Sequence, residues 1–331
     1  MGDVMITRRQ VMRAGLVAAG AAMAGSPARA DFPDRMIRWI VPFPAGGGLD
    51  AVTRIVAGKL ADNIGQNVIV ENKSGGSGFI GIVALTQSKP DGYTLMMQAL
   101  GMSMNPSIYK RLPYDPVNDI QPVAQIGAVP VIVAIGPKVE VATLAEFVAL
   151  AKSQPRRYKG AAFAVGSSTL MFEMFKLQAG VDVSIVPYRG VVDAVAATVG
   201  GETDLVIMDG TSVVPHIKAG RLRGLAVAAK ARMAELPDVP TTTEVGLPDY
   251  RIEFWYAAFT RGGTPSPIVA RLNSEINKAV AAPEVTGKLK AMGLTPLNRT
   301  ADEFTNQHHR EMKEWAEVVK QSGFKLLEIS Q

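Results

Sequence analysis

The chain has 331 residues, enough for two domains with separate cores, and its 47% hydrophobic and 20% charged residues are typical of a globular protein rather than a disordered one. It contains no cysteine, which excludes disulfides, thiolate metal ligands and cysteine nucleophiles. Residues 1–30 hold four arginines and one aspartate, so the rest of the chain keeps only +2 of the net charge of +5, which argues against a nucleic-acid partner.

The first segment predicts export from the cytoplasm. Arg8 and Arg9 form a twin-arginine motif, an apolar run extends from Ala14 to Gly25, and Ala28 and Ala30 form an A-x-A cleavage site. The apolar run is too short for a membrane helix, which needs about 20 residues. We therefore predict a twin-arginine signal peptide over residues 1–30, cleaved after Ala30, and a periplasmic mature protein.

Strand and helix patterns then alternate along the chain. This alternation with short links indicates an α/β fold built from βαβ units. Strands are predicted at 36–42, 67–71, 94–98, 160–165, 183–186, 204–208 and 222–228, and helices at 49–64, 78–88, 143–153, 168–179, 190–200 and 211–219.

Two longer apolar runs, 123–135 and 252–260, interrupt the alternation, and we interpret them as strands that cross between two lobes. Lobe 1 is predicted to comprise residues 31–128 and to resume at 253–331, and lobe 2 to comprise residues 129–252. The tail is predicted to be helical at 267–281, 283–292 and 301–321.

Glycine-rich loops follow several predicted strands. In Gly46–Gly48, between a strand and a helix, free amides and the helix dipole make an anion site without a charged side chain. Residues 74–78 and 98–105 follow the next two strands, and residues 166–169, 187–190 and 208–210 follow strands of lobe 2. Loops at the ends of parallel strands gather at one edge of a sheet, so the two sets predict a binding cleft between the lobes.

Two other functions remain open from the residues alone. Residues 46–51 satisfy G-x-G-x-x-A and Glu71 closes the next strand, which would suit an exported nucleotide-dependent oxidoreductase. Pro42 and Pro44 argue against a nucleotide-binding loop, because they distort the approach of the strand to residues 46–51. The third hypothesis is a sensor subunit that presents a ligand-loaded lobe to a signalling partner.

Catalytic motifs are scarce. Neighbouring His308 and His309 point about 100° apart on a helix, so they cannot bind one metal together, and we interpret both as surface residues. The chain has no H-E-x-x-H and no G-x-S-x-G motif. We therefore expect no catalytic residue and no metal site. Trp255 and Tyr256 fit equally the core or the floor of the cleft.

An ordered series of motifs runs along the chain. They are 32–38 (FPDRMIR), 41–50 (VPFPAGGGLD), 70–78 (VENKSGGSG), 90–95 (PDGYTL), 105–116 (NPSIYKRLPYDP), 186–190 (VPYRG), 215–223 (PHIKAGRLR), 236–241 (LPDVPT) and 263–265 (GTP). In this order the series resembles the Bug-type extracytoplasmic solute receptors, the binding proteins of tripartite tricarboxylate transporters. The resemblance implies a two-lobed, type II-like periplasmic-binding-protein fold that closes on a small organic carboxylate, binds no cofactor and delivers its ligand to membrane permease subunits. We expect the protein to be a monomer.

The resemblance also implies the ligand-binding positions. Met102 and Thr169 stand where family members often carry histidine, which implies fewer polar groups in this cleft and a ligand with an apolar body. The implied positions are Phe43, Pro44, Ala45, Gly46, Gly47, Asp50, Gly75, Gly76, Gly78, Gly101, Met102, Ser167, Ser168, Thr169, Tyr188 and Asp209.

Overall fold

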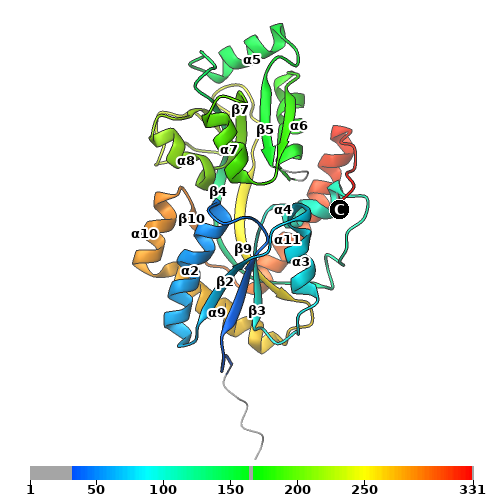
Figure 1. Ribbon diagram of the computed structural model, residues 1–331, viewed down its shortest axis with the longest axis vertical. Coiled ribbons are helices and arrows are strands. Elements are labelled where there is room, and N and C mark those ends of the chain that lie inside the picture. Colours follow the sequence, from blue (N-terminus) through cyan, green and yellow to red (C-terminus); the bar gives the residue numbers. More distant parts are fainter. Residues whose placement is uncertain (1–31, 164–166, 330–331) are drawn as a thin grey trace, which may run out of the picture. The chain divides into compact units, whose positions relative to one another are not determined.

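The computed structural model describes residues 32–163 and 167–329 (Figure 1). The predicted signal peptide over 1–30 lies outside the described residues, as does the end of the strand predicted at 160–165. Within the described ranges, no helix is both long and apolar enough to cross a membrane.

The body of the chain is built on a ten-stranded sheet in which two long strands cross from one half to the other. β4 (Ile120–Ile135) pairs with β9 (Glu253–Arg261) along residues 120–130, and with β7 and β8 along residues 131–135. The order is β2 (Val68–Asn72), β1 (Ile37–Val41), β3 (Thr94–Ala99), β9, β4, β7 (Leu205–Asp209), β5 (Lys159–Phe163) and β6 (Ser184–Tyr188), while β8 (Arg223–Val227) and β10 (Thr295–Pro296) also pair with β4.

The pairing directions reveal the two halves. β1 pairs in parallel with β2 and β3, and β5 pairs in parallel with β6 and β7, whereas β4 and β9 run antiparallel to all their partners. Both faces of β4 are buried nearly throughout, which explains its almost continuous apolar sequence. The predicted crossover strands are therefore present: β4 begins three residues before the apolar run 123–135, and β9 is shifted by one residue from the run 252–260.

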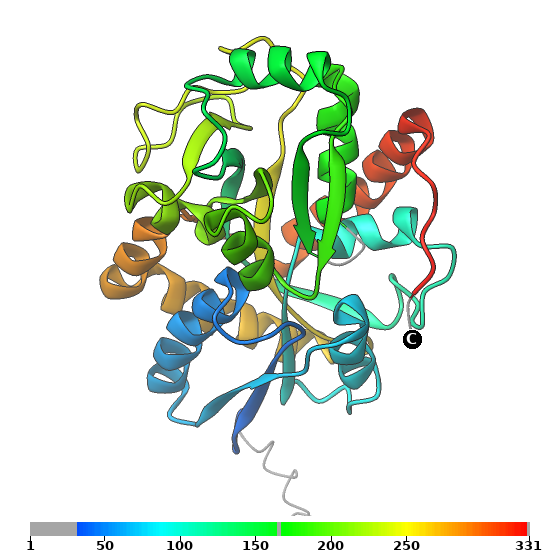
Figure 2. The same cartoon turned by 45° about the horizontal axis from the view of Figure 1, so that its top comes forward.

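Each half of the sheet has its own helices (Figures 1 and 2). The first and last parts of the chain share one half, where α2 packs against α9 and α10, and α11 packs against α4 and β4. These helices are α2 (Gly48–Ile64), α3 (Phe79–Thr86) after the 3₁₀ turn η1 (Gly76–Gly78), α4 (Gly101–Ile108), α9 (Ser266–Ala281), α10 (Pro283–Ala291) and α11 (Ala301–Ser322). The other half carries α5 (Leu144–Ser153), α6 (Ser167–Ala179), α7 (Val191–Val199) and α8 (Gly210–Lys218).

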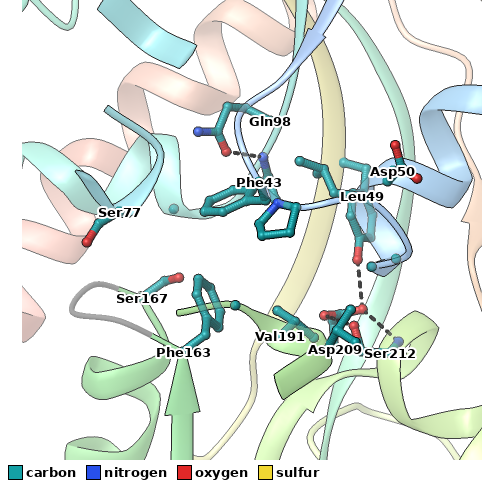
Figure 3. Close-up of a pocket in the computed structure, with 18 of the residues that line it drawn as sticks. Phe43, Leu49, Asp50, Ser77, Gln98, Phe163, Ser167, Val191, Asp209 and Ser212 are labelled. Carbon is teal, nitrogen blue, oxygen red and sulfur yellow. Dashed lines mark hydrogen bonds between the residues drawn. The ribbon is translucent and has the colours of Figure 1, made fainter. Parts of the chain in front are cut away.

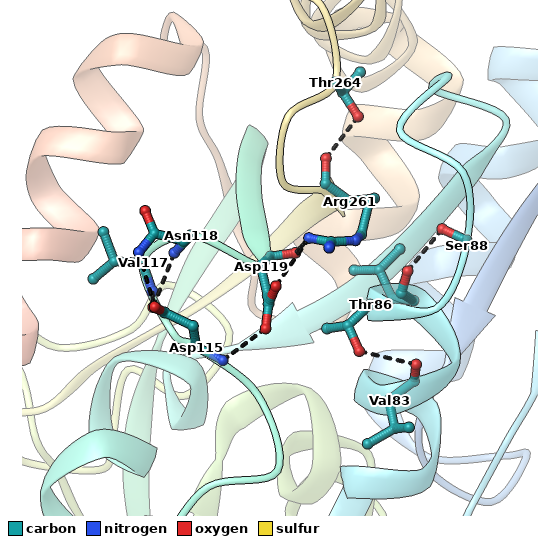
Figure 4. A network of polar contacts seen from close by, with 10 residues as sticks. Val83, Thr86, Ser88, Asp115, Val117, Asn118, Asp119, Arg261 and Thr264 are labelled. Atoms are coloured by element: carbon teal, nitrogen blue, oxygen red, sulfur yellow. Dashed lines mark hydrogen bonds and ion pairs between the residues drawn. The ribbon is translucent and has the colours of Figure 1, made fainter.

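A polar clamp joins the start of β4 to the end of β9 (Figure 4). The Asp119 carboxylate accepts a hydrogen bond from the Asp115 amide at 2.8 Å and pairs with Arg261 at 3.1 Å. The Asp119 carbonyl accepts from Arg261 Nη1 at 3.0 Å and from the Gly262 amide at 2.8 Å. The two crossover strands are thus tied together at the end remote from β7.

One helix was not predicted, and one histidine was misplaced. α4 follows β3 directly and contains Pro106, whose missing amide argues against a helix in sequence analysis.

The prediction that His308 lies on the surface is wrong: its side chain is 1% exposed, with Nδ1 2.7 Å from Ser103 Oγ of α4. The polarity of histidine suggested exposure, but here packing between α4 and α11 buries it, and burial lowers the pKa of His308 to about 3.

Candidate functional site

A cavity of about 210 Å³ lies where the loops after β1, β3, β6 and β7 meet the end of β5 and the start of α6 (Figure 3). β9 supplies its floor with Phe254 and Tyr256, so Tyr256 lines the cavity while neighbouring Trp255 packs on Phe304 and His308. The remaining lining residues are Phe43, Pro44, Ala45, Gly47, Gly48, Leu49, Asp50, Ser77, Gln98, Ala99, Gly101, Asn105, Tyr109, Phe163, Ser167, Gly190, Val191, Val192, Asp193, Asp209 and Ser212.

The N-terminus of α2 opens into this cavity. Gly47 is its N-cap in an extended conformation, and no side chain caps the helix. The first amides of a helix have no intrahelical acceptor, so those of Gly48 and Leu49 are free to bind an anion. The space beside Gly47 is open, because a methyl group on Gly47 would meet only Val192, at 3.9 Å.

The N-terminus of α7 faces that of α2 across the cavity. Its N-cap is Gly190, again without a side-chain cap, and Val191, Val192 and Asp193 of its first turn line the cavity. A methyl group on Gly190 would lie 3.5 Å from the Pro44 ring of the α2 loop. Two partial positive charges, one from each half of the sheet, therefore point into the same small space.

Asp50 stabilises the α2 loop. Its carboxylate accepts hydrogen bonds from the Gly46 amide at 3.1 Å, Arg54 Nε at 3.0 Å and Asn72 Nδ2 at 3.0 Å. Burial alone would raise the pKa of Asp50, but the bonds from Arg54, Gly46 and Asn72 outweigh it and hold the pKa below its usual value. All these donors come from the protein, which favours the interpretation of Asp50 as a helix first-turn acid over a contact to a ligand ammonium.

Asp209 joins both halves through a buried hydroxyl cluster. As N-cap of α8 it accepts from the Ser212 amide at 3.2 Å and Ser212 Oγ at 2.9 Å. Tyr256 of β9 donates its hydroxyl to Asp209 Oδ1 at 2.7 Å, and Thr211 Oγ1 donates to the same oxygen. Burial, then the negative charge of Asp209, raise the pKa of Tyr256 well above its usual value, so Tyr256 is a neutral donor.

Aromatic and aliphatic side chains form much of the remaining wall. Phe43, after β1, and Phe163, at the end of β5, meet edge to face with ring centroids 5.8 Å apart (Figure 3). Gly78 makes room for the Phe43 ring, since a methyl group there would lie 3.1 Å from Phe43 Cζ. No lysine, arginine or histidine is among the described residues that line the cavity.

Two neutral polar side chains remain available to a ligand. Gln98 is 4% exposed; its Oε1 accepts from the Ala99 amide, whereas its Nε2 has no partner among the described residues. Ser167, at the start of α6, is 6% exposed, and its hydroxyl likewise bonds to no described residue. Both line the cavity, and each can donate one hydrogen bond to a ligand.

The structure brings part of the predicted site together. Residues at the cavity wall are Phe43, Pro44, Ala45, Gly47, Asp50, Gly101, Ser167 and Asp209. Predicted positions that do not line it are Gly46, Gly75, Gly76, Gly78, Met102, Ser168, Thr169 and Tyr188. Their binding roles stay predictions.

Local contacts explain several positions away from the wall. Met102 is 1% exposed, with its sulfur 4.0 Å from the Tyr114 hydroxyl, so it does not supply an apolar surface to the cavity. The Tyr188 hydroxyl donates to Glu202 at 3.0 Å. Ser168 is fully buried.

Sequence reasoning missed most of the apolar wall. Phe163 ends a strand and Phe254 begins one, and neither position carries a motif. Val191 and Val192 follow the VPYRG motif, so the glycine before a helix was the usable signal there. The described residues hold no group of three or more His, Cys, Asp or Glu side chains that could bind a metal ion.

Comparisons with known proteins agree over nearly the whole chain. Residues 52–324 match the model of the Tripartite tricarboxylate transporter family receptor. BugT of Bordetella pertussis is 35% identical over 319 residues, covering 94% of this chain and 97% of BugT.

Two solved structures superpose well. One, described as a periplasmic transporter, is 35% identical with a TM-score of 0.86 and covers 89% of this chain and 100% of its own. The other, a Rhodopseudomonas palustris protein with adipate, is 30% identical with a TM-score of 0.85 and covers 88% of this chain and 99% of its own.

Proposed function

The chain belongs to the tripartite tricarboxylate transporter family of receptors, and on this premise we propose that amides of α2 and α7 hold the carboxylate of a small organic solute. The family membership confirms the Bug-type resemblance, and the solved relatives confirm the two-lobed α/β fold. A receptor of this family serves solute uptake by binding rather than catalysis.

The observation that carries the proposal is the opposed pair of uncapped helix N-termini. α2 and α7 begin at Gly47 and Gly190, neither of which offers a capping side chain. An anion between them would accept several amide hydrogen bonds and interact favourably with both dipoles. The adipate complex of the Rhodopseudomonas palustris relative supports a carboxylate as that anion.

The oxidoreductase alternative has no support from the relatives. Its ribose-binding acid would be Glu71, which instead pairs with Lys73 at 2.8 Å and Arg38 at 3.7 Å. A nucleotide would also need a larger space than about 210 Å³.

The proposal also covers the export of the protein and the delivery of the solute. The protein is exported by a twin-arginine signal over residues 1–30, cleaved after Ala30, and acts as a periplasmic monomer. Lobe 1 (31–128 and 253–331) and lobe 2 (129–252) close on the solute, and membrane permease subunits of a tripartite tricarboxylate-type transporter receive it.

Matched acids and amides test the proposal. Benzoate, adipate and citrate are compared with benzamide, adipamide and citramide in thermal unfolding of the mature chain. We expect at least one acid to raise the melting temperature and its amide to leave it unchanged, because a ligand at 100 times its Kd stabilises by about 2.7 kcal/mol. Stabilisation by none of the acids, or equally by acid and amide, would contradict carboxylate binding.

A pair of glycine variants locates the anion site. Gly47→Val keeps an ordinary backbone conformation but places a branched side chain over the free amides of α2. Gly58→Val, at an exposed position in the middle of the same helix with nothing within 4 Å, is the matched control. We expect binding to be lost in the first variant and retained in the second, as measured by calorimetry with the best acid.

A further inference from the structure

The cavity wall carries information about the class of carboxylate. We propose that this receptor selects an aromatic monocarboxylate over di- and tricarboxylates. This inference rests on the proposed function, since it takes for granted that the amides of α2 and α7 hold one carboxylate.

The charges at the wall disfavour a second carboxylate. The acidic side chains that line the cavity are Asp50, Asp193 and Asp209, and the described lining holds no basic side chain. Asp50 and Asp209 already accept hydrogen bonds from protein donors, so neither is available to a ligand ammonium. A second carboxylate would lose its hydration and find no cationic side chain at the described wall, which is unfavourable because nothing there neutralises its charge.

The nearest basic side chains do not supply that cation. Arg54 reaches no further than Asp50 and Asn72, to which it is bonded at 3.0 and 2.8 Å. Arg189 precedes Gly190 of the wall, but its side chain is exposed and does not line the cavity.

The aromatic wall defines the rest of the ligand. Phe43 and Phe163 come from different halves of the sheet and meet edge to face at 83°. Phe254 and Tyr256 form a second such pair on β9, with centroids 5.6 Å apart. Aromatic rings favour this geometry with one another, so a ligand ring that contacts these pairs is favoured beyond the burial of its area.

The volume of the cavity is compatible with a small ligand. Drug-sized ligands occupy sites of roughly 300–1,000 Å³. A cavity of about 210 Å³ suits a single ring with one carboxylate, and the free donors Gln98 Nε2 and Ser167 Oγ can bind a hydroxyl or a carboxylate oxygen. The proposed ligand is therefore a benzoate-like acid.

Calorimetry on the mature chain tests the selection directly. We expect benzoate to bind at least about tenfold more tightly than adipate or citrate, a difference of about 1.4 kcal/mol or more. Adipate or citrate binding as tightly as benzoate would overturn the inference while leaving the proposed carboxylate function intact. Failure of every acid to bind would instead overturn the proposed function.

A charge added at the rim tests the reason for the selection. Val192 is 45% exposed at the start of α7, so Val192→Lys should fold, and Val192→Met adds comparable length without charge. We expect the lysine variant to bind adipate at least about tenfold more tightly than the methionine variant does, by the same conversion. Equal adipate affinity in the two variants would show that the missing cation is not what excludes dicarboxylates.

A ring deletion tests the aromatic part. Phe163→Leu keeps an apolar side chain but removes the partner of Phe43. We expect the preference for benzoate over hexanoate to fall by about two- to thirteenfold, the conversion of the about 0.5–1.5 kcal/mol that an aromatic pair contributes. An unchanged preference, with the variant folded by circular dichroism, would contradict ring recognition at this wall.

Discussion

The α-carbon of Gly48 is packed against Thr211. A methyl group on Gly48 would lie 3.1 Å from Thr211 Cβ, 3.0 Å from the Tyr256 hydroxyl and closer still to Thr211 Oγ1. Gly48 begins α2 in one half of the sheet and Thr211 lies in the first turn of α8 in the other. The two halves can approach this closely only because residue 48 has no side chain.

Gly48→Ala should therefore disfavour this close approach of the two halves. The backbone of Gly48 is helical, so alanine adds bulk without backbone strain. We expect the affinity for the best acid to fall by about tenfold or more, consistent with overpacking costs of about 1–3 kcal/mol. Adding Thr211→Ala removes the nearest atom and should restore part of the loss; no recovery in the double variant would contradict the steric explanation.

Tyr256→Phe tests the hydroxyl cluster around Asp209. The variant keeps the ring but removes the donor at 2.7 Å, while Asp209 retains Thr211 and Ser212. Bonds to charged groups contribute about 1.5–3 kcal/mol. We expect the free energy of unfolding, measured in urea, to decrease by about that amount. A variant as stable as the wild type would mean that the cluster contributes little.

His308 makes stability depend on pH. Its folded pKa of about 3 lies below its usual value of 6.5, so the unfolded chain binds a proton that the folded chain excludes. The contribution of His308 to the free energy of unfolding is fully present above about pH 6.5 and decreases as the pH falls towards 3. Burial raises the pKa of nearby Glu311, which acts in the opposite direction because the folded chain then binds the proton more readily.

His308→Leu should flatten this dependence. We expect the wild type to lose more unfolding free energy than the variant between pH 7 and pH 4, as measured by urea titration at each pH. The buried Ser103 hydroxyl keeps a partner in the variant, because it also donates to Glu311 at 3.1 Å. Parallel curves for the two proteins would exclude His308 as the source.

Gly262→Ala should break the clamp between β4 and β9. The new methyl group would lie 2.8 Å from the Asn118 carbonyl carbon and nearer still to its oxygen, and backbone atoms there cannot move aside easily. We expect a loss of about 1–3 kcal/mol of unfolding stability. Gly287 lies at an exposed position of α10, and a methyl group there would meet nothing within 4 Å. Gly287→Ala should therefore raise the free energy of unfolding by about 0.5–1 kcal/mol. Equal effects of the two variants would contradict the packing argument.

The sequence predicted the elements with strong patterns and missed those that depend on tertiary packing. The crossover strands were recognisable because strands buried on both faces need long apolar runs. α4 was missed because Pro106 masks a short helix that α11 stabilises by packing. The prediction of a helix at 78–88 was close, since α3 follows a 3₁₀ turn at Gly76–Gly78.

The candidate site was also predicted only in part. Glycines before a helix indicated that the N-terminus of α2 meets the cavity, because a helix start without a capping side chain is visible in the local sequence. Phe163 and Val192 reach the wall only through the pairing of distant strands, and no local sequence pattern predicts that pairing. The expectation of an apolar ligand was based on Met102 and Thr169, neither of which lines the cavity; the same expectation now rests on Phe43 and Phe163.

The position of β9 has a consequence for the order of synthesis. β9 lies between β3 and β4 in the sheet, yet its residues 253–261 are made more than a hundred residues after β4 ends at Ile135. Until then, β3 and β4 each present an unpaired apolar edge on the growing chain, and such edges invite aggregation. A ribosome-bound chain that stops before residue 253 should therefore need a holding chaperone, and this need should end once residue 261 has emerged.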